Sequence, residues 1–144
     1  DRVQVNSCFA SSALTAQSES GRAGSSGNSN SIAYDYAAVI VNDRYGRSIG
    51  STVGYLGYMA NASRTLHWMD FGYPAASPFA GQYLHLNAAS HARDDGNFSP
   101  NPIGIGTDMT GGCSGGPWIY KFDQYAGAYN YVNGVNSYKY INPN

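Results

Sequence analysis

Short apolar stretches separated by turn residues are the feature that most limits what this 144-residue chain can fold into. No window keeps the helical period of about 3.6 residues, and no segment repeats at a fixed interval. Tyrosine and glycine, with 13 and 18 copies, favour strands and turns over helices. Residues 87–102 are polar and contain prolines and Gly96, so we expect a loop there. Strands are expected at residues 32–41, 51–60, 65–71, 82–86, 117–122 and 131–138. The pattern predicts an all-β barrel or sandwich.

Charge is scarce, and this excludes several classes of protein. Charged residues make up 12% of the chain, and the formal net charge is −1. So few charges do not build a coiled coil, and no basic stripe is present to bind nucleic acid. No apolar run reaches the ~18 residues that a membrane-spanning helix needs. A hydrophobic share of 42% suffices for a folded core. We therefore expect neither nucleic acid nor a membrane as a partner.

Several features are typical of a secreted protein. Residues 16–31 form the one low-complexity stretch and are expected to be an exposed loop. Triplets that accept N-glycosylation begin at Asn61 and Asn97. Two cysteines, Cys8 and Cys113, are too few for a disulfide scaffold, and no Cys/His set has the spacing of metal ligands. The first residues lack the lead of a signal peptide, so a secreted chain would have been processed at its start. We expect an extracellular protein, and the Cys/His spacing predicts no metal site.

The densest chemical signal is the segment 108–118, Asp-Met-Thr-Gly-Gly-Cys-Ser-Gly-Gly-Pro-Trp. A serine between glycines and before a proline lies on a tight turn, which leaves the Ser114 hydroxyl uncovered for attack. The glycines let backbone N–H groups converge on one small space, as an oxyanion requires. The alternative is a glycine-rich hairpin turn without chemistry. The run 111–118 is more specific than a bare Gly-x-Ser-Gly and favours a nucleophile.

These residues resemble the nucleophile motif of chymotrypsin-like (trypsin-like) serine proteases, in the fungal and bacterial branch of secreted glutamyl-endopeptidase-like enzymes. Three further segments resemble that branch in the same order: 33–40, 51–58, and 71–79 with its Gly-Tyr-Pro turn. The resemblance implies a chymotrypsin-like double β-barrel, of which the chain holds part of the first barrel and most of the second. The end of the N-terminal barrel would be residues 1–48, and the C-terminal barrel with the nucleophile residues 49–144.

The resemblance also implies a catalytic site. Ser114 would be the nucleophile, Asp35 would orient the base, and the backbone N–H groups of Gly112 and Ser114 would form the oxyanion hole. An ionised, unpartnered aspartate inside an apolar strand is costly, so we expect Asp35 at a strand end or beside a partner such as an imidazole N–H. The alternative is an aspartate that faces solvent from its strand.

Substrate binding is implied along a strand that lines the groove, where an extended peptide adds as a further β-strand. Asp108 would lie at the base of the specificity pocket, although a structural hydrogen-bonding role is an equal alternative. The substrate-binding residues would be Asp108, Asn136, Ser137 and Tyr138.

A catalytic triad also needs a base, and the family takes it from a histidine upstream of the aspartate. No histidine precedes Asp35, because His67, His85 and His91 all lie between Asp35 and Ser114. We expect these three to be packed or surface residues. The catalytic histidine is instead expected on an N-terminal segment of the same protease, outside residues 1–144, so that the chain is a partial one.

The expected function is that of a secreted serine endopeptidase acting on a peptide or protein substrate. It would hydrolyse peptide bonds through an acyl-enzyme on Ser114, with the histidine of the N-terminal segment as base and with no cofactor. The alternative is a catalytically inactive module with a protease fold, which binds without cleaving. Cys113 is expected to be a small buried hydrophobe beside the nucleophile.

Overall fold

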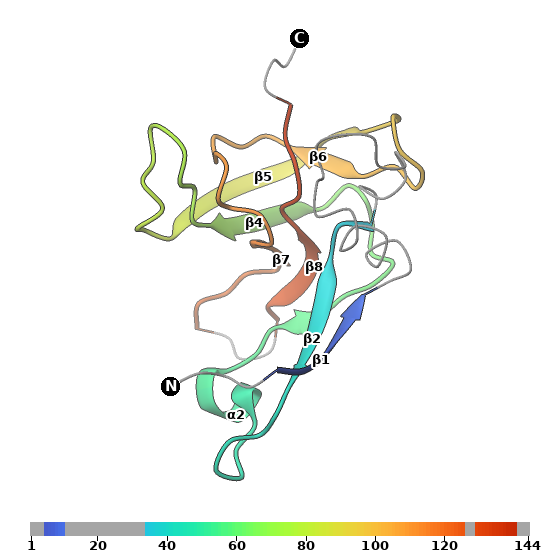
Figure 1. The fold of residues 1–144 in the computed structure, drawn as a ribbon. Helices are drawn as coiled ribbons and strands as arrows, with labels where there is room; N and C mark the ends of the chain where they lie inside the picture. Colours follow the sequence, from blue (N-terminus) through green and yellow to red (C-terminus); the bar gives the residue numbers. More distant parts are fainter. Residues whose placement is uncertain (1–4, 11–33, 126–128, 141–144) are drawn as a thin grey trace. The chain divides into compact units, whose positions relative to one another are not determined.

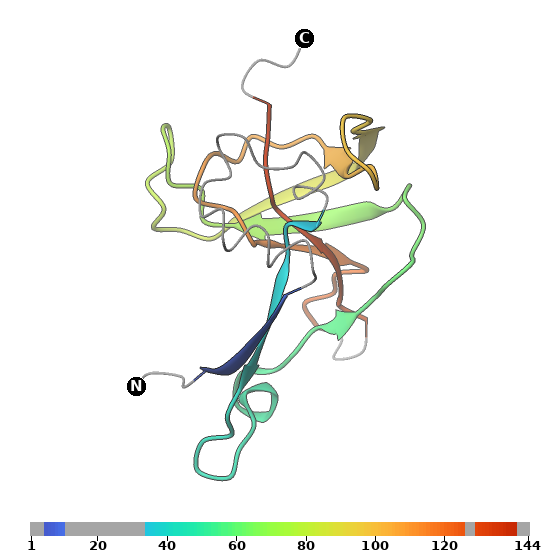
Figure 2. The ribbon, with the colours of Figure 1, turned by 45° about the vertical axis from the view of Figure 1, so that its right-hand side comes forward.

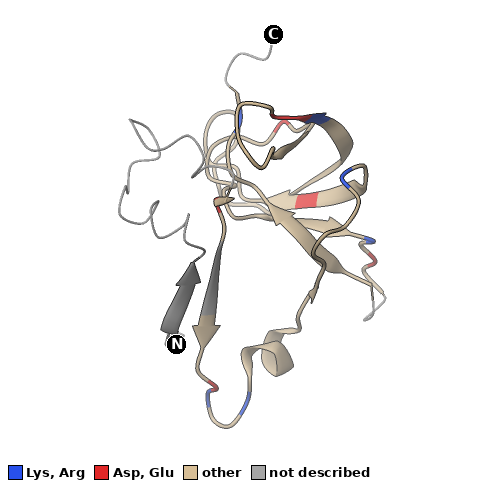
Figure 3. Cartoon of the chain, turned by 90° about the vertical axis from the view of Figure 1, so that its right-hand side faces the viewer, with Lys and Arg blue, Asp and Glu red and all other residues tan. Residues whose placement is uncertain are grey.

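The structure is a computed structural model that describes residues 5–10, 34–125 and 129–140. The chain divides into two compact units: unit 1 is Asp1–Tyr55 with Asn97–Asn101, and unit 2 is Leu56–Gly96 with Pro102–Asn144. Within the described residues, no helix has the length and apolar character needed to cross a membrane. Most of the described ribbon carries no charged residue, and acidic and basic positions are few (Figure 3).

Unit 1 contains a two-stranded antiparallel sheet, in which β1 (Val5–Ala10) pairs with β2 (Ala37–Val41). The valines and isoleucine of β2 are β-branched and favour this extended conformation. The strand predicted over 32–41 therefore forms in its second half, and residues 34–36 precede it without strand pairing. The first two residues of that prediction, and the loop predicted over 16–31, lie outside the described residues.

A short helix, α2 (Ile49–Val53), corrects the strand predicted over 51–60. Ser48 caps its N-terminus, since the Ser48 side chain accepts a hydrogen bond from the Ser51 N–H at 3.1 Å. Gly54 ends it with a φ of +82°, and the Gly54 N–H donates back to the Gly50 carbonyl. A serine cap and a glycine stop this close together outweigh the strand propensity between them.

Unit 2 is built on a six-stranded sheet with the order β3-β8-β7-β4-β5-β6 (Figure 1). The pairs are antiparallel, except that β3 and β8 run parallel. Its longest strands, β4 and β5, run side by side in both views (Figures 1 and 2). The strands are β3 (Gly57–Tyr58), β4 (His67–Gly72), β5 (His85–Asp94), β6 (Ile103–Ile105), β7 (Pro117–Tyr120) and β8 (Tyr131–Val135).

Strand β5 corrects the loop predicted over 87–102, because the strand continues to Asp94. Its alanine, serine and asparagine residues have little intrinsic preference for a strand. They are held extended by pairing with β4 on one side and with β6 on the other. Strand β6 was not predicted from the sequence at all, since Ile103–Ile105 is short and centred on a glycine.

The core of unit 2 is centred on Trp68, which has no exposed surface. Strand β4 buries Trp68, Asp70 and Gly72 in alternation, since successive side chains of a strand point to opposite faces. The ring centroids of Trp68 and Trp118 are 5.5 Å apart. The Trp68 indole N–H donates to the Asn133 amide oxygen at 3.1 Å. The core therefore combines aromatic packing with hydrogen-bonded polar side chains.

Candidate active site

Ser114 lies at the corner of a tight turn directly before β7. The Gly116 N–H donates to the Cys113 carbonyl at 3.0 Å, which closes a four-residue turn with Ser114 and Gly115 in its centre. Gly115 has a φ of +80°, the value that the third residue of a type II turn requires and that glycine adopts readily. The Ser114 side chain is exposed and makes no hydrogen bond with any described residue. The local sequence thus leaves Ser114 exposed at the corner of the turn.

The segment before this turn packs against the Gly-Tyr-Pro turn that follows β4. The Gly111 carbonyl accepts hydrogen bonds from the N–H groups of Ala75, at 2.7 Å, and Ala76, at 3.1 Å. Gly112 has a φ of +108°, and a Cβ there would lie 2.7 Å from the Ala75 Cβ and 2.9 Å from the Tyr73 carbonyl oxygen. Only glycine fits at position 112 without a shift of the neighbouring backbone.

Two backbone donors in the same segment as Ser114 have no hydrogen-bond acceptor among the described residues. Neither the Gly112 N–H nor the Ser114 N–H donates to another residue in the part of the chain that the structure describes. A solvent-accessible N–H without an internal acceptor is available to a ligand oxygen.

Asn136, directly after β8, ties the turn to the sheet. Its backbone N–H donates to the Gly116 carbonyl at 2.9 Å, and its own carbonyl accepts from the Gly115 N–H at 2.8 Å. Its side-chain amide donates to the Asp70 carboxyl at 2.7 Å and accepts from the Trp118 indole N–H at 2.8 Å. Asn136 was predicted as a substrate contact, and the structure places its polar groups against the turn and the sheet.

Asp70 is fully buried in β4, and sequence reasoning missed it. One carboxyl oxygen binds the Asn136 amide, and the other has no hydrogen-bond partner among the described residues. Burial raises the pKa of the Asp70 carboxyl, and the hydrogen bond from the Asn136 amide offsets part of this effect. An acidic residue inside the apolar stretch 65–71 was the signal that could have identified it.

Cys113 is half-buried, less enclosed than the buried hydrophobe expected from the sequence. The thiol donates to the Thr110 carbonyl at 3.1 Å and forms no disulfide with a described residue. Burial, and then the nearby Asp70, raise the pKa of the Cys113 thiol. A thiol with a raised pKa is a poor nucleophile near neutral pH.

The segment 136–140 continues β8 and is anchored at Asp95, which is 7% exposed. The hydroxyls of Tyr138 and Tyr140 both donate to the same Asp95 carboxyl oxygen at 2.7 Å. Burial, and then Asp95, raise the pKa of Tyr138. Between the tyrosines, the Lys139 ammonium donates to the Met109 carbonyl at 3.2 Å. The two tyrosines therefore reach the end of β5, and Lys139 reaches the segment that leads to Ser114.

The other predicted site residues fall in both units. Asp108 is exposed in unit 2 and makes no ion pair with a described residue, and Ser137 is half-buried beside Tyr138. Asp35 belongs to unit 1, is exposed, and lies outside a strand, two positions before β2. Unit 2 brings Ser114, Gly112 and Asn136 together, and the proximity of Asp35 to Ser114 stays a prediction.

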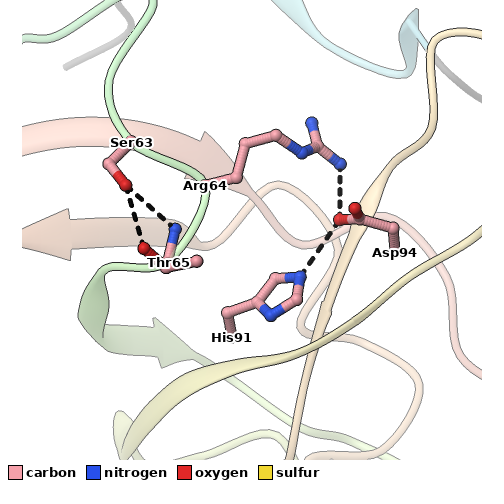
Figure 4. A network of polar contacts seen from close by, with 5 residues as sticks. All are labelled: Ser63, Arg64, Thr65, His91 and Asp94. Atoms are coloured by element: carbon pink, nitrogen blue, oxygen red, sulfur yellow. Dashed lines mark hydrogen bonds and ion pairs between the residues drawn. The ribbon is translucent and has the colours of Figure 1, made fainter.

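The three histidines contact groups other than Ser114. His67 pairs with the Ser90 hydroxyl at 3.0 Å, and the His85 ring packs edge-on against Phe79 with centroids 4.5 Å apart. His91 contacts Asp94 at 3.0 Å (Figure 4). None of the three hydrogen-bonds to Ser114 within the described residues.

Figure 4 also shows that Asp94 binds Arg64, at 2.7 Å, as well as the imidazole. The hydrogen bonds from Arg64 and His91 hold the pKa of Asp94 below its ordinary value. Because Arg64 and Asp94 are both exposed, their ion pair is a surface feature with little effect on stability.

The buried carboxyl of Asp70 gives a prediction for stability against pH. The folded protein holds this proton more tightly than the unfolded chain, whose pKa is 3.8. The unfolding free energy of the wild type should therefore fall, relative to Asp70→Asn, as the pH rises from about 3.8 through the raised pKa. Urea denaturation of both proteins across this range measures the difference. A wild-type free energy that stays constant or rises with pH, relative to Asp70→Asn, would contradict the burial of an ionisable group here.

Comparison with known proteins identifies two related structures, while no protein-family model and no curated protein matches the chain. The thermostable serine protease AL20 from an extremophilic microorganism is 32% identical, with a TM-score of 0.62, over 76% of this chain and 48% of that one. The protease Anisep from Arthrobacter nicotinovorans is 32% identical, with a TM-score of 0.72, over 97% of this chain and 57% of that one. The chain thus spans about half the length of each structure.

These matches agree with the sheet-rich architecture observed in unit 2. Identity of 32% over nearly the whole chain extends beyond a likeness of fold alone. The fold expected from the sequence is confirmed. The chain has an all-β, chymotrypsin-like fold, and it is related in sequence and structure to solved serine proteases.

Proposed function

We propose that the protein is a secreted serine endopeptidase that hydrolyses peptide bonds through an acyl-enzyme on Ser114. The observation that carries this proposal is the turn itself. An exposed serine shares this turn segment with two backbone N–H groups that have no acceptor among the described residues, in a chain 32% identical to a serine protease. Assignment to the glutamyl-endopeptidase-like branch is part of the proposal and rests on the motif resemblance.

In the proposed reaction, the Ser114 oxygen attacks the carbonyl carbon of the scissile bond while a base removes its proton. The carbonyl oxygen becomes an oxyanion, and the N–H groups of Gly112 and Ser114 donate to it. The intermediate collapses, the base protonates the leaving amine, and an ester to Ser114 remains. Water, deprotonated by the same base, then hydrolyses this ester and restores the serine.

A histidine on an N-terminal segment outside residues 1–144 is proposed as the base, with Asp35 as the carboxylate that orients it. The contacts of His67, His85 and His91 with other groups support this assignment. Asp35 is exposed two residues before β2, and its role in the proposal rests on the resemblance of residues 33–40 to the family.

The proposed substrate is an extended peptide that lies along residues 136–138 as an added strand. Asn136 already uses its backbone groups on the turn, so Ser137 and Tyr138 would make the nearest contacts. Asp108 would contribute at the base of the pocket, where its exposed carboxylate is accessible. Secretion is proposed because the chain carries few charges and because Asn61, in an acceptor triplet, is exposed.

A fluorophosphonate probe tests the nucleophile on the full natural polypeptide. We expect covalent labelling of Ser114, measured by mass spectrometry of the peptide that contains it, and loss of both labelling and peptide hydrolysis in Ser114→Ala. Cys113→Ala, the matched control one residue away, should label normally. If the folded wild type does not label but still binds peptides, the inactive binding module is the correct function.

Gly112 provides a test of the oxyanion donors. Gly112→Val should lower kcat/KM by about 100-fold or more, because its side chain collides with Tyr73 and Ala75 and displaces the N–H group. Gly111→Ala is the control, since a Cβ at position 111 meets nothing within 4 Å. Steady-state hydrolysis of a peptide substrate measures both variants. Comparable activity in the two would remove Gly112 from the site.

Asp35 provides a test of the proposed triad. Asp35→Asn should lower kcat by roughly 10³- to 10⁴-fold, because an amide does not hold the imidazole in the tautomer that accepts the serine proton. Asp43→Asn, at another exposed aspartate of unit 1, should leave kcat unchanged. Should both variants keep wild-type kcat, Asp35 is not the orienting carboxylate.

A further inference from the structure

Two similar indole–amide pairs lie in the core of unit 2, and only one of them reaches the turn of Ser114. Trp118 donates to the Asn136 amide oxygen, and Trp68 donates to the Asn133 amide oxygen. The Asn133 amide then donates to the Met59 carbonyl at 2.9 Å, away from the turn. The Asn136 amide donates to the buried Asp70. The two pairs therefore differ in the acceptor of the asparagine amide, which is a backbone carbonyl for Asn133 and a buried carboxyl for Asn136.

The free-energy cost of burying the Asp70 carboxyl indicates that this residue has a role other than stability. Its side chain lies in the middle of β4, where Asp70 pairs in register with Asn87 on β5 and Trp118 on β7. It has no exposed surface, and one carboxyl oxygen has no partner among the described residues. A buried acceptor without a partner destabilises a fold, and an apolar side chain of similar size would avoid the penalty. Stability alone does not account for this residue.

Asp70 determines which way the Asn136 amide points. The carboxyl oxygen accepts from the amide nitrogen, while the Trp118 indole donates to the amide oxygen. With an acceptor on one side and a donor on the other, only one of the two amide orientations satisfies both contacts. The side chain of Asn136 is thereby fixed from two directions.

A fixed Asn136 in turn fixes the backbone next to Ser114. The Asn136 backbone exchanges hydrogen bonds with Gly115 and Gly116, the two residues after the serine. The turn also lies directly on the amide, because a Cβ at Gly116 would be 2.9 Å from the Asn136 amide nitrogen. No side chain separates the Asn136 amide from Gly116, so a displacement of the amide would also displace the turn.

We propose that Asp70 is a positioning residue for Ser114, which acts through the Asn136 amide to hold the turn in the geometry for attack. This inference rests on the proposed function, because it assigns Asp70 to the same reaction. Asp70 itself is buried beneath the turn and does not contact the substrate.

The first test replaces Asp70 in the full natural polypeptide. Asp70→Leu should lower kcat, and the rate of labelling by a fluorophosphonate, by about 10- to 100-fold with KM within about twofold, because a small misplacement of the nucleophile affects the chemical step. Asp70→Asn should recover activity to within about threefold, since its amide oxygen still accepts from Asn136. A wild-type kcat in Asp70→Leu overturns the proposal.

Matched tryptophan variants test the same amide from its other side, and they remain informative if Asp70→Leu does not fold. Trp118→Phe and Trp68→Phe each keep an aromatic ring and remove one indole N–H. We expect Trp118→Phe to lower kcat several-fold, and Trp68→Phe to lower the melting temperature while kcat stays within about twofold of the wild type. Equal losses of kcat in both variants would show a general effect of the core and would overturn the positioning role.

The wild type separates the two proposals. If it neither labels nor hydrolyses peptides, the proposed function and the positioning role both fail. If it is active, and Asp70→Leu labels at the same rate, only the positioning role fails.

Discussion

The geometry of the candidate site depends on the hydrogen bonds of one residue, Asn136. Its backbone holds the two glycines after Ser114, and its side chain joins them to β4 and β7. A turn of four residues has too few internal contacts to keep one conformation against the entropy of the chain. The sheet supplies the missing constraint, and Asn136 transmits it. The exposed serine is therefore supported by a buried polar contact.

Close backbone approach is the second requirement of this region, and it accounts for part of the glycine content. At Gly72, a Cβ would lie 2.6 Å from the Cys113 Cβ, so β4 and the turn are in direct contact there. Gly116 is equally enclosed, between the Phe71 carbonyl and the Asn136 amide. Side chains at these positions would separate the turn from the sheet, and the hydrogen bonds of Asn136 would be lost with them.

Local patterns were enough to predict the elements whose cause is local. The turn at Ser114 and strands β4, β7 and β8 follow from glycine placement and apolar runs, and the all-β, chymotrypsin-like fold was expected from them and from the motif resemblance. The helix Ile49–Val53 was missed because its cap and stop were not weighed against strand propensity. The length of β5, and the contacts of Asp70 and Asp95, depend on partners distant in sequence, and no local pattern encodes those pairings.

The chain contains two tryptophans, and Trp118 is the one whose hydrogen bond reaches the asparagine beneath the turn. Their rings are 5.5 Å apart, and each indole N–H is hydrogen-bonded to an asparagine. Indole emission responds to hydrogen bonding and to nearby aromatic rings. Among residues 1–144, the tryptophan fluorescence therefore comes from the core of unit 2, and Trp118 reports on the amide that supports the turn.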